Sequence, residues 1–202
     1  MKALRRHSMF LFPMWVGLLL FGCFDRAAAA ERPNVLWITI EDMSPILGCY
    51  GDELANTPHF DALADEGVRY TNAFASASVC TPARSCLITG VRACSMGTQH
   101  LRGPQPLAPQ LRTYPSLLRK AGYYTTNCVK EDYNFRTPPE TWDESSGKAH
   151  WRNGPEGKPF FSIFNLTDSH QSRVRFPKER FDEMAARVGL AERTDPAKVK
   201  LP

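Results

Sequence analysis

The sequence lacks several patterns that would assign the chain to a common class of protein. It has no C-x-x-C pair and no short run that combines cysteine with histidine, so a structural zinc site is not predicted. Internal repeats and low-complexity tracts are also absent, which excludes collagen-like and disordered polymers. The apolar run at 9–24 is interrupted by Pro13 and is shorter than the roughly 20 residues that a transmembrane helix needs. The composition, 43% hydrophobic and 23% charged, is that of one ordinary globular domain.

Residues 1–30 have the three-part layout of a secretory signal peptide. Basic residues near the start precede the apolar run, and four alanines end the segment. We therefore expect cleavage after Ala30, which leaves 31–202 as the mature part, and export to the periplasm or out of the cell. An alternative is a lipid anchor through Cys23, because the residues before it resemble a lipobox, although Phe21 stands where a small residue is usual.

This leader accounts for most of the formal net charge of +4. It carries four basic residues and one acidic residue, a net of +3, so the rest of the chain has a net charge of about +1. The basic balance therefore indicates export and predicts no nucleic-acid partner. We expect no stable membrane span either.

Five of the six cysteines lie beyond the leader. An odd number in an exported protein leaves one thiol without a disulfide partner, and that thiol needs an explanation. The five are Cys49, Cys80, Cys86, Cys94 and Cys128.

Strand and helix signals alternate along the chain. Apolar or β-branched runs predict strands, and the first of them is typical of a strand buried on both faces of a parallel sheet. Helices are predicted where a capping residue or an early proline opens an apolar period and a glycine closes it. The predicted strands are 34–40, 68–74, 123–129 and 160–166, and the predicted helices are 58–66, 81–89, 115–121 and 178–188. Surface connections without strands are expected at 103–109 and 136–157.

This alternation predicts an α/β layered fold with a largely parallel central sheet flanked by helices. Ligands of such sheets bind beyond the carboxyl ends of the strands. The chemistry is therefore expected near Glu41, Cys80, Lys130 and Asp168, which follow predicted strands or open a predicted helix.

The stretch from Ser78 to Gly90 is the most informative part of the sequence. It places Cys80 at the N-terminal edge of a predicted helix, with Arg84 one turn further on. A helix N-terminus and a guanidinium both stabilise negative charge, so this is either an activated nucleophile or an anion-binding corner. The alternative is a cysteine that is simply buried beside a helix cap.

These residues resemble the signature of the sulfatase family, because Cys80-Thr81-Pro82-Ala83-Arg84 matches its C-x-P-x-R pattern. The resemblance implies that a formylglycine-generating, sulfatase-maturing enzyme oxidises Cys80 to formylglycine during export. The hydrated aldehyde presents two hydroxyls: one attacks sulfur, and loss of the proton of the other later expels sulfate. A modified Cys80 would also account for the odd number of thiols.

Glu41 and Asp42 also match the family, in which a pair of acids follows the motif N-V-L-x-I and holds a divalent cation. The resemblance implies a metal site made by Glu41, Asp42 and the group derived from Cys80, and hard oxygen ligands suit Ca²⁺ or Mg²⁺. The usual pair is Asp-Asp, so Glu41 departs from the pattern and Asp42 is the safer ligand. Without the resemblance, two acids at a strand end are most often solvated turn residues.

Two further matches lie after later predicted strands. Lys130 resembles the lysine of the family's K-W-H motif and would contact the sulfate, while Asp132 occupies the position of the histidine. His170 resembles a histidine that binds the anion or protonates the leaving oxygen. A histidine after a strand is otherwise most often a loop residue, and His100 carries the same ambiguity.

The resemblance spans about 32–173 and implies that 31–202 is the N-terminal part of a sulfatase domain, incomplete at its C-terminus. The expected function is hydrolysis of a sulfuric ester, with a sulfated small molecule or glycan as substrate and a carbohydrate sulfate favoured. Two alternatives stay open. One is a phosphodiester or phosphonate hydrolase of the same superfold, and the other is an inactive, truncated sulfatase-like remnant.

Overall fold

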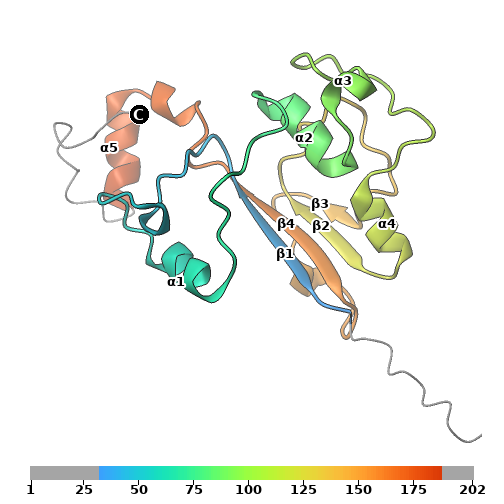
Figure 1. The fold of residues 1–202 in the computed structure, drawn as a ribbon, viewed down its shortest axis with the longest axis horizontal. Helices are drawn as coiled ribbons and strands as arrows, with labels where there is room; N and C mark the ends of the chain where they lie inside the picture. The colour runs from blue at the N-terminus through green and yellow to red at the C-terminus, as the bar shows by residue number, and fades with distance from the viewer. Residues whose placement is uncertain (1–31, 188–202) are drawn as a thin grey trace, which may run out of the picture. The chain divides into compact units, whose positions relative to one another are not determined.

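A computed structural model describes residues 32–187 (Figure 1). The chain divides into a unit of residues 1–33 and a unit of residues 34–202, and the account below concerns the described part of the second. The predicted leader, its cleavage site and Cys23 lie outside the described residues. Within the described part, no helix has both the length and the apolar character that crossing a membrane requires.

The centre of this unit is a four-stranded parallel sheet, as the sequence predicted. Its strands are β1 (Val35–Ile40), β2 (Tyr124–Cys128), β3 (Glu144–Ser145) and β4 (Phe160–Leu166), in the order β1-β4-β2-β3 (Figure 1). In the register, Val35 lies opposite Phe161, and Tyr124 lies opposite Phe160. The carboxyl ends of β1, β4 and β2 therefore meet at one edge of the sheet.

Helices are placed close to their predicted positions. Thr81, Pro82 and Arg84 are buried in the first turns of α2, and Gly90 ends this helix in the left-handed region at φ 69°, its N–H donating to the carbonyl of Cys86. Four of the helices are α1 (Pro58–Glu66), α2 (Cys80–Thr89), α4 (Tyr114–Lys120) and α5 (Lys178–Arg187). The sequence did not predict α3 (Ala93–Met96) or the short 3₁₀ turns η1 (Gly48–Tyr50), η2 (Trp151–Asn153) and η3 (Arg173–Arg175).

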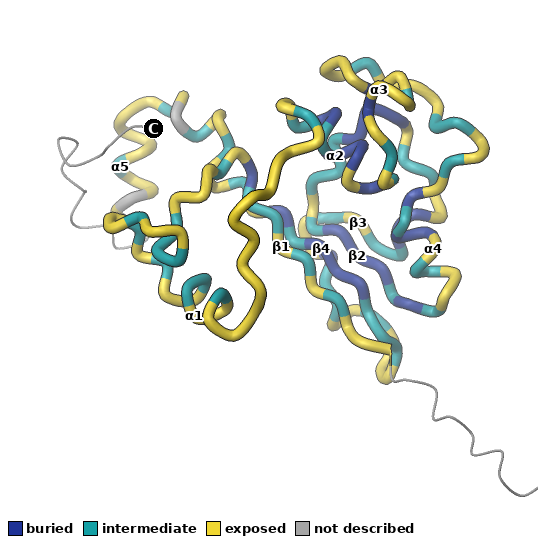
Figure 2. Tube along the Cα trace, in the orientation of Figure 1, coloured by how far each residue is buried: buried dark blue, intermediate teal, exposed yellow. Residues whose placement is uncertain are grey.

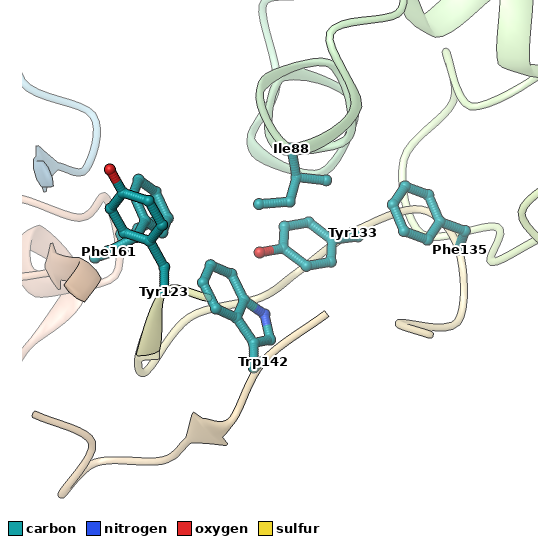
Figure 3. Close-up of a cluster of buried hydrophobic side chains, with 7 residues drawn as sticks. Ile88, Tyr123, Tyr133, Phe135, Trp142 and Phe161 are labelled. Atoms are coloured by element: carbon teal, nitrogen blue, oxygen red, sulfur yellow. The ribbon is translucent and has the colours of Figure 1, made fainter. Parts of the chain in front are cut away.

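The hydrophobic core lies between one face of the sheet and the helices α2 and α4 (Figure 2). Figure 3 shows six of its buried side chains with labels. Phe161 is central to it, because its ring stacks on Trp142 at 6.2 Å and meets Tyr114 edge-on at 5.3 Å. The buried members are Ile88, Tyr123, Tyr133, Phe135, Trp142, Phe161 and Ile163. This core fixes α2, and therefore Cys80 and Arg84, against the ends of the strands.

The opposite face of the sheet is only partly covered. Trp151 of η2 stacks on Phe160 at 5.6 Å and meets Phe164 edge-on at 5.5 Å. Leu36 and Ile38 of β1 point to this same face by the alternation of the strand, and both are about half exposed.

Three expectations from the sequence are wrong. Residues 68–74 do not form a strand: no described strand pairs with them, and Val68, Tyr70 and Phe74 are exposed. The alternating pattern favours an extended chain, but a strand also needs a hydrogen-bonding neighbour. Conversely, the connection 136–157 contains the strand β3 and the buried Trp142. The first predicted strand is not buried on both faces, because Leu36 and Ile38 of β1 are about half exposed.

Asp143 joins the start of β3 to β2 and α4. Its carboxylate accepts hydrogen bonds from the Thr125 N–H at 2.9 Å and from Nε of Arg119 at 2.7 Å. Partial burial acts to raise the pKa of Asp143, but these donors outweigh burial and hold the pKa below its usual value.

A carboxyl with a depressed pKa in the folded state stabilises the fold above its unfolded pKa, and this contribution is lost as pH falls through the folded value. We therefore expect the stability of the chain to fall between about pH 5 and pH 3, and Asp143→Asn to flatten that part of the profile. Urea unfolding midpoints measured across this range test the expectation. Replacement of the exposed Asp65 by Asn is the matched control, and an unchanged slope in Asp143→Asn would contradict it.

Candidate functional site

A cluster of charged side chains lies where β1, β2 and β4 end and α2 begins. Glu41 follows β1 directly, and its backbone is fixed because its N–H donates to the carbonyl of Leu166 at 2.9 Å. The Ser169 hydroxyl donates to the Glu41 carbonyl at 2.5 Å. These two hydrogen bonds fix the backbone of Glu41 at the carboxyl edge of the sheet, where the sequence analysis expected the chemistry.

Glu41 is buried and lies between two cations. Its Oε1 accepts from the Lys130 ammonium at 2.8 Å, and its Oε2 lies 4.0 Å from the Arg84 guanidinium. The Glu41 side chain is 7% exposed and that of Lys130 is 18% exposed, so these pairs are largely shielded from water. A buried carboxylate without a partner is costly, and these two cations are the partners of Glu41.

Arg84 is held from several sides. Its guanidinium donates to Oδ1 of Asn165 at 2.8 Å and to the carbonyl of Glu131 at 2.8 Å, with a further hydrogen bond to the carbonyl of Lys130. Asn165 in turn donates to Oδ1 of Asn127 at 2.9 Å. This network locks α2 onto the ends of β2 and β4.

Cys80 opens α2 and is half-buried, with its thiol 4.0 Å from the Thr81 hydroxyl. All five cysteines among the described residues are free thiols. The Thr81 hydroxyl donates to Oδ1 of Asp132 at 3.2 Å, and Oδ2 of Asp132 lies 3.6 Å from the Lys130 ammonium. A chain of contacts therefore runs from Cys80 through Asp132 to Lys130.

Asp42 and His170 form a second, more exposed part of the site. Oδ2 of Asp42 accepts from the N–H of Gln171 at 2.9 Å and lies 3.9 Å from Nε2 of His170. The other ring nitrogen of His170 is 2.8 Å from the Ser172 hydroxyl. Asp42 adopts a positive φ of 53°, unusual outside glycine, which turns the chain sharply after Glu41.

Burial also affects the tyrosines behind the site. It raises the pKa of Tyr133 and of Tyr114 above the ordinary value, while the charge of Arg84 acts in the opposite direction on both. Both hydroxyls therefore stay neutral across the physiological range. They add no negative charge beside Arg84.

Across residues 32–187, no three His, Cys, Asp or Glu side chains come together as a metal-binding cluster. Glu41 and Asp42 supply carboxylate oxygens, which is the donor type that Ca²⁺ and Mg²⁺ prefer, but these ions take six or more ligands. The described residues thus fit a hard cation in donor chemistry and supply only part of its shell. Glu41 also has both oxygens directed at cations, so Asp42 is the better placed ligand of the two.

The structure brings together Cys80, Arg84, Lys130 and Glu41, as the sequence predicted, and sets His170 beside Asp42. Asp168 is exposed in the turn after β4, and Nε2 of His100 lies 3.3 Å from the carbonyl of Gly103. Sequence reasoning missed Asn165 and Asn127, which hold Arg84. The available signal was an asparagine near the end of each of two predicted strands, where an apolar residue is expected.

Comparisons with known proteins identify the family of the chain. The family model described as Sulfatase matches residues 33–141, which is more than half of the chain. The chain belongs to the sulfatase family. An ulvan-active sulfatase of Formosa agariphila is 43% identical over 159 residues, which are 73% of this chain and 27% of that protein. Human iduronate 2-sulfatase is 33% identical over 125 residues, or 58% of this chain and 23% of the relative.

Solved structures support the fold assignment. BT4656, solved in complex with its substrate D-glucosamine-2-N,6-O-disulfate, superposes with a TM-score of 0.58 at 24% identity over 70% of this chain and 35% of that chain. The putative sulfatase yidJ of Bacteroides fragilis gives a TM-score of 0.57 at 20% identity, and the match covers 77% of this chain and 48% of that chain. The chain spans about a quarter of the length of the curated sulfatases named above.

The asparagine behind Arg84 provides a test of this network. We expect Asn165→Ala to reduce the free energy of unfolding by about 1–3 kcal/mol, because the buried Arg84 and Asn127 groups lose their partner. Asn153→Ala, which removes an exposed asparagine that bonds Glu144 at 2.8 Å, should cost about 1 kcal/mol or less. Urea denaturation of both variants gives the comparison, and equal losses would show that Asn165 is not a special support.

Proposed function

We propose that the whole protein is a sulfatase that hydrolyses a sulfate ester of a carbohydrate, with the nucleophile derived from Cys80. The observation that carries this proposal is the joint position of Cys80, Arg84 and Lys130 at the carboxyl edge of the sheet. A thiol alone at a helix N-terminus would say little, but here two shielded cations accompany it. Cations at this edge suit a substrate whose leaving product is an anion.

Each residue of the site has a role that its geometry supports. Cys80, once converted to formylglycine, supplies a hydroxyl nucleophile and a route for expelling sulfate. Lys130 is the residue that contacts the sulfate oxygens and offsets their charge, since its ammonium faces Asp132 and therefore the side of Thr81 and Cys80. Arg84 holds Glu41 and the backbone after β2 in place and adds positive charge behind the nucleophile.

His170 serves the same reaction from the other side of the site. Its Nδ1 is paired with the Ser172 hydroxyl, which sets the direction of the ring, and Nε2 faces Asp42. A histidine oriented in this way can bind the sulfate or give a proton to the leaving oxygen. Neither role requires the ring to be buried, and the His170 side chain is 21% exposed.

The proposed metal is Ca²⁺ or Mg²⁺, held by Asp42, Glu41 and the group formed from Cys80. Such an ion would supply positive charge next to the sulfate. Asp42 fits this role best, because the Glu41 carboxylate is engaged with Lys130 and Arg84. Further oxygen ligands are required to complete the shell.

A sulfated carbohydrate is the favoured substrate class. The matched relatives include an ulvan-active sulfatase, an iduronate 2-sulfatase and an N-acetylglucosamine-6-O-sulfatase of Bacteroides thetaiotaomicron, the last 29% identical over 150 residues.

The proposal also includes a sulfatase-maturing enzyme as partner, and export to the periplasm or outside the cell with removal of residues 1–30. Intact-mass analysis of the exported protein tests the removal of residues 1–30, and a chain that starts at Glu31 is the expected result.

Peptide mass spectrometry across Cys80 tests the nucleophile. Trypsin cuts after Arg69 and Arg84, and the peptide between them contains Cys80 as its only cysteine. From a host with formylglycine-generating machinery, we expect this peptide to be lighter than the unmodified form by about 18 Da, the difference between a thiol and an aldehyde.

The peptide that contains Cys94 is the internal control and should keep the mass of a free thiol. A Cys80→Ala variant should show no conversion. An unmodified Cys80 in a host that converts a known sulfatase would contradict the proposed nucleophile and favour an inactive sulfatase-like protein.

A further inference from the structure

We propose that Arg102 forms a subsite for a second anionic group of the substrate, a carboxylate or another sulfate, beside the group that is hydrolysed. This inference rests on the proposed function. It adds that the protein prefers sulfated carbohydrates that carry a second anionic group. The observation that carries it is an exposed guanidinium held at the rim of the site by a loop with a strained backbone. The guanidinium Nε of Arg102 lies 3.9 Å from the Asp132 carboxylate, and its side chain is 62% exposed.

The loop that carries Arg102 is anchored by a buried residue. Asn134 is fully buried, and its Oδ1 accepts from the N–H of Gly103 at 2.8 Å, while its amide donates to the carbonyls of Thr98 (3.1 Å) and His100. The carbonyl of Asn134 also accepts from the N–H of Gln105 at 3.0 Å. One side chain and its backbone therefore fix both sides of the turn at 101–102.

The turn is further fixed by a close approach at Gly103. A Cβ atom added there would collide with the imidazole of His100, so a larger residue at this position would require the His100 side chain to move. Arg102 itself adopts a positive φ of 52°. Such a conformation is unfavourable for arginine and persists only where the surroundings impose it, which is common at ligand-binding positions.

Arg102 is connected to the proposed nucleophile through few contacts. Asp132 accepts from the Thr81 hydroxyl at 3.2 Å with its Oδ1, the same oxygen that faces Arg102, and Thr81 follows Cys80 in α2. The guanidinium thus lies on the Cys80 side of the site. A substituent of the same or a neighbouring sugar ring could reach it while a sulfate lies at Cys80.

Arg102 can leave Asp132 and bind a ligand with little loss of stability. It is long and exposed on the arginine side, and such surface pairs contribute little to stability. Asp132 keeps Lys130 at 3.6 Å and Thr81 as partners when Arg102 turns away. An arginine that is freed in this way offers a planar pair of N–H donors, which matches a carboxylate or a sulfate.

The charges around Arg102 allow an anion to bind. Lys130 and Asp132 compensate each other, and Arg84 and Glu41 lie behind them in the buried part of the cluster. Together with Arg102, these groups make three cations and two carboxylates. The excess positive charge is on the exposed arginine at the rim.

Binding of matched carbohydrates by the whole protein tests the subsite. The probes are a monosulfated uronic acid–hexosamine disaccharide, its carboxyl-reduced counterpart, and a disulfated, carboxyl-reduced disaccharide, each titrated calorimetrically at low salt. We expect the wild-type chain to bind both probes with a second anion at least about fivefold more tightly than the probe with one sulfate. If only one of these two probes binds more tightly, its second anion is the ligand of the subsite.

Arg102→Gln should abolish this difference and leave the affinity for the monosulfated, carboxyl-reduced probe unchanged. Arg152→Gln, at an exposed arginine of η2, is the matched control and should keep the difference. A preference that persists in Arg102→Gln, or an equal loss for all three probes, would overturn the subsite while the proposed function stands. Failure of the whole wild-type protein to bind even the monosulfated probe would count against the proposed function as well.

Discussion

The site depends on one buried cation. The Arg84 guanidinium links α2 to the ends of β1, β2 and β4 through Glu41, Asn165 and the carbonyls after β2. A guanidinium cannot lose its charge, so each of its donors needs an acceptor in the folded state. Because the acceptors lie at the ends of three strands, the helix that carries Cys80 has one position in which Arg84 is satisfied, and the orientation of Cys80 follows from it.

The substitution of glutamate for the usual aspartate at position 41 has a visible consequence. The longer side chain reaches Lys130 at 2.8 Å and lies within 4.0 Å of Arg84, so Glu41 compensates buried cations. Asp42, 39% exposed and turned aside by its positive φ, is left to face His170. The two adjacent acids therefore differ in their surroundings: Glu41 compensates charge within the protein, and the more exposed Asp42 contacts Gln171 and His170.

The sequence predicted those parts of the fold that depend on local signals. The apolar run before Glu41, the glycine after α2 and the alternation of strands with helices were enough to place β1, β4 and α2 and to bring Cys80, Lys130 and Glu41 to one edge. The strand predicted at 68–74 is wrong, because strand pairing depends on a neighbouring strand that no local pattern specifies. Asn165, Asn127 and Asn134 were missed for a related reason: a buried amide is recognised only once its partners are known.

The buried and the exposed cations of the site differ in what they can do for a ligand. Arg84 and Lys130 have their charge matched inside the protein, by Glu41 and by backbone carbonyls, so they give fixed positive potential without rearrangement. Among the described residues, Arg102 is paired with Asp132 over a long distance of 3.9 Å, and its side chain is mostly exposed, so it can turn to a ligand. A fixed cation suits the group that reacts, since its geometry must not change between substrates. An exchangeable cation suits a group that distinguishes one substrate from another, because it contributes only when that group is present.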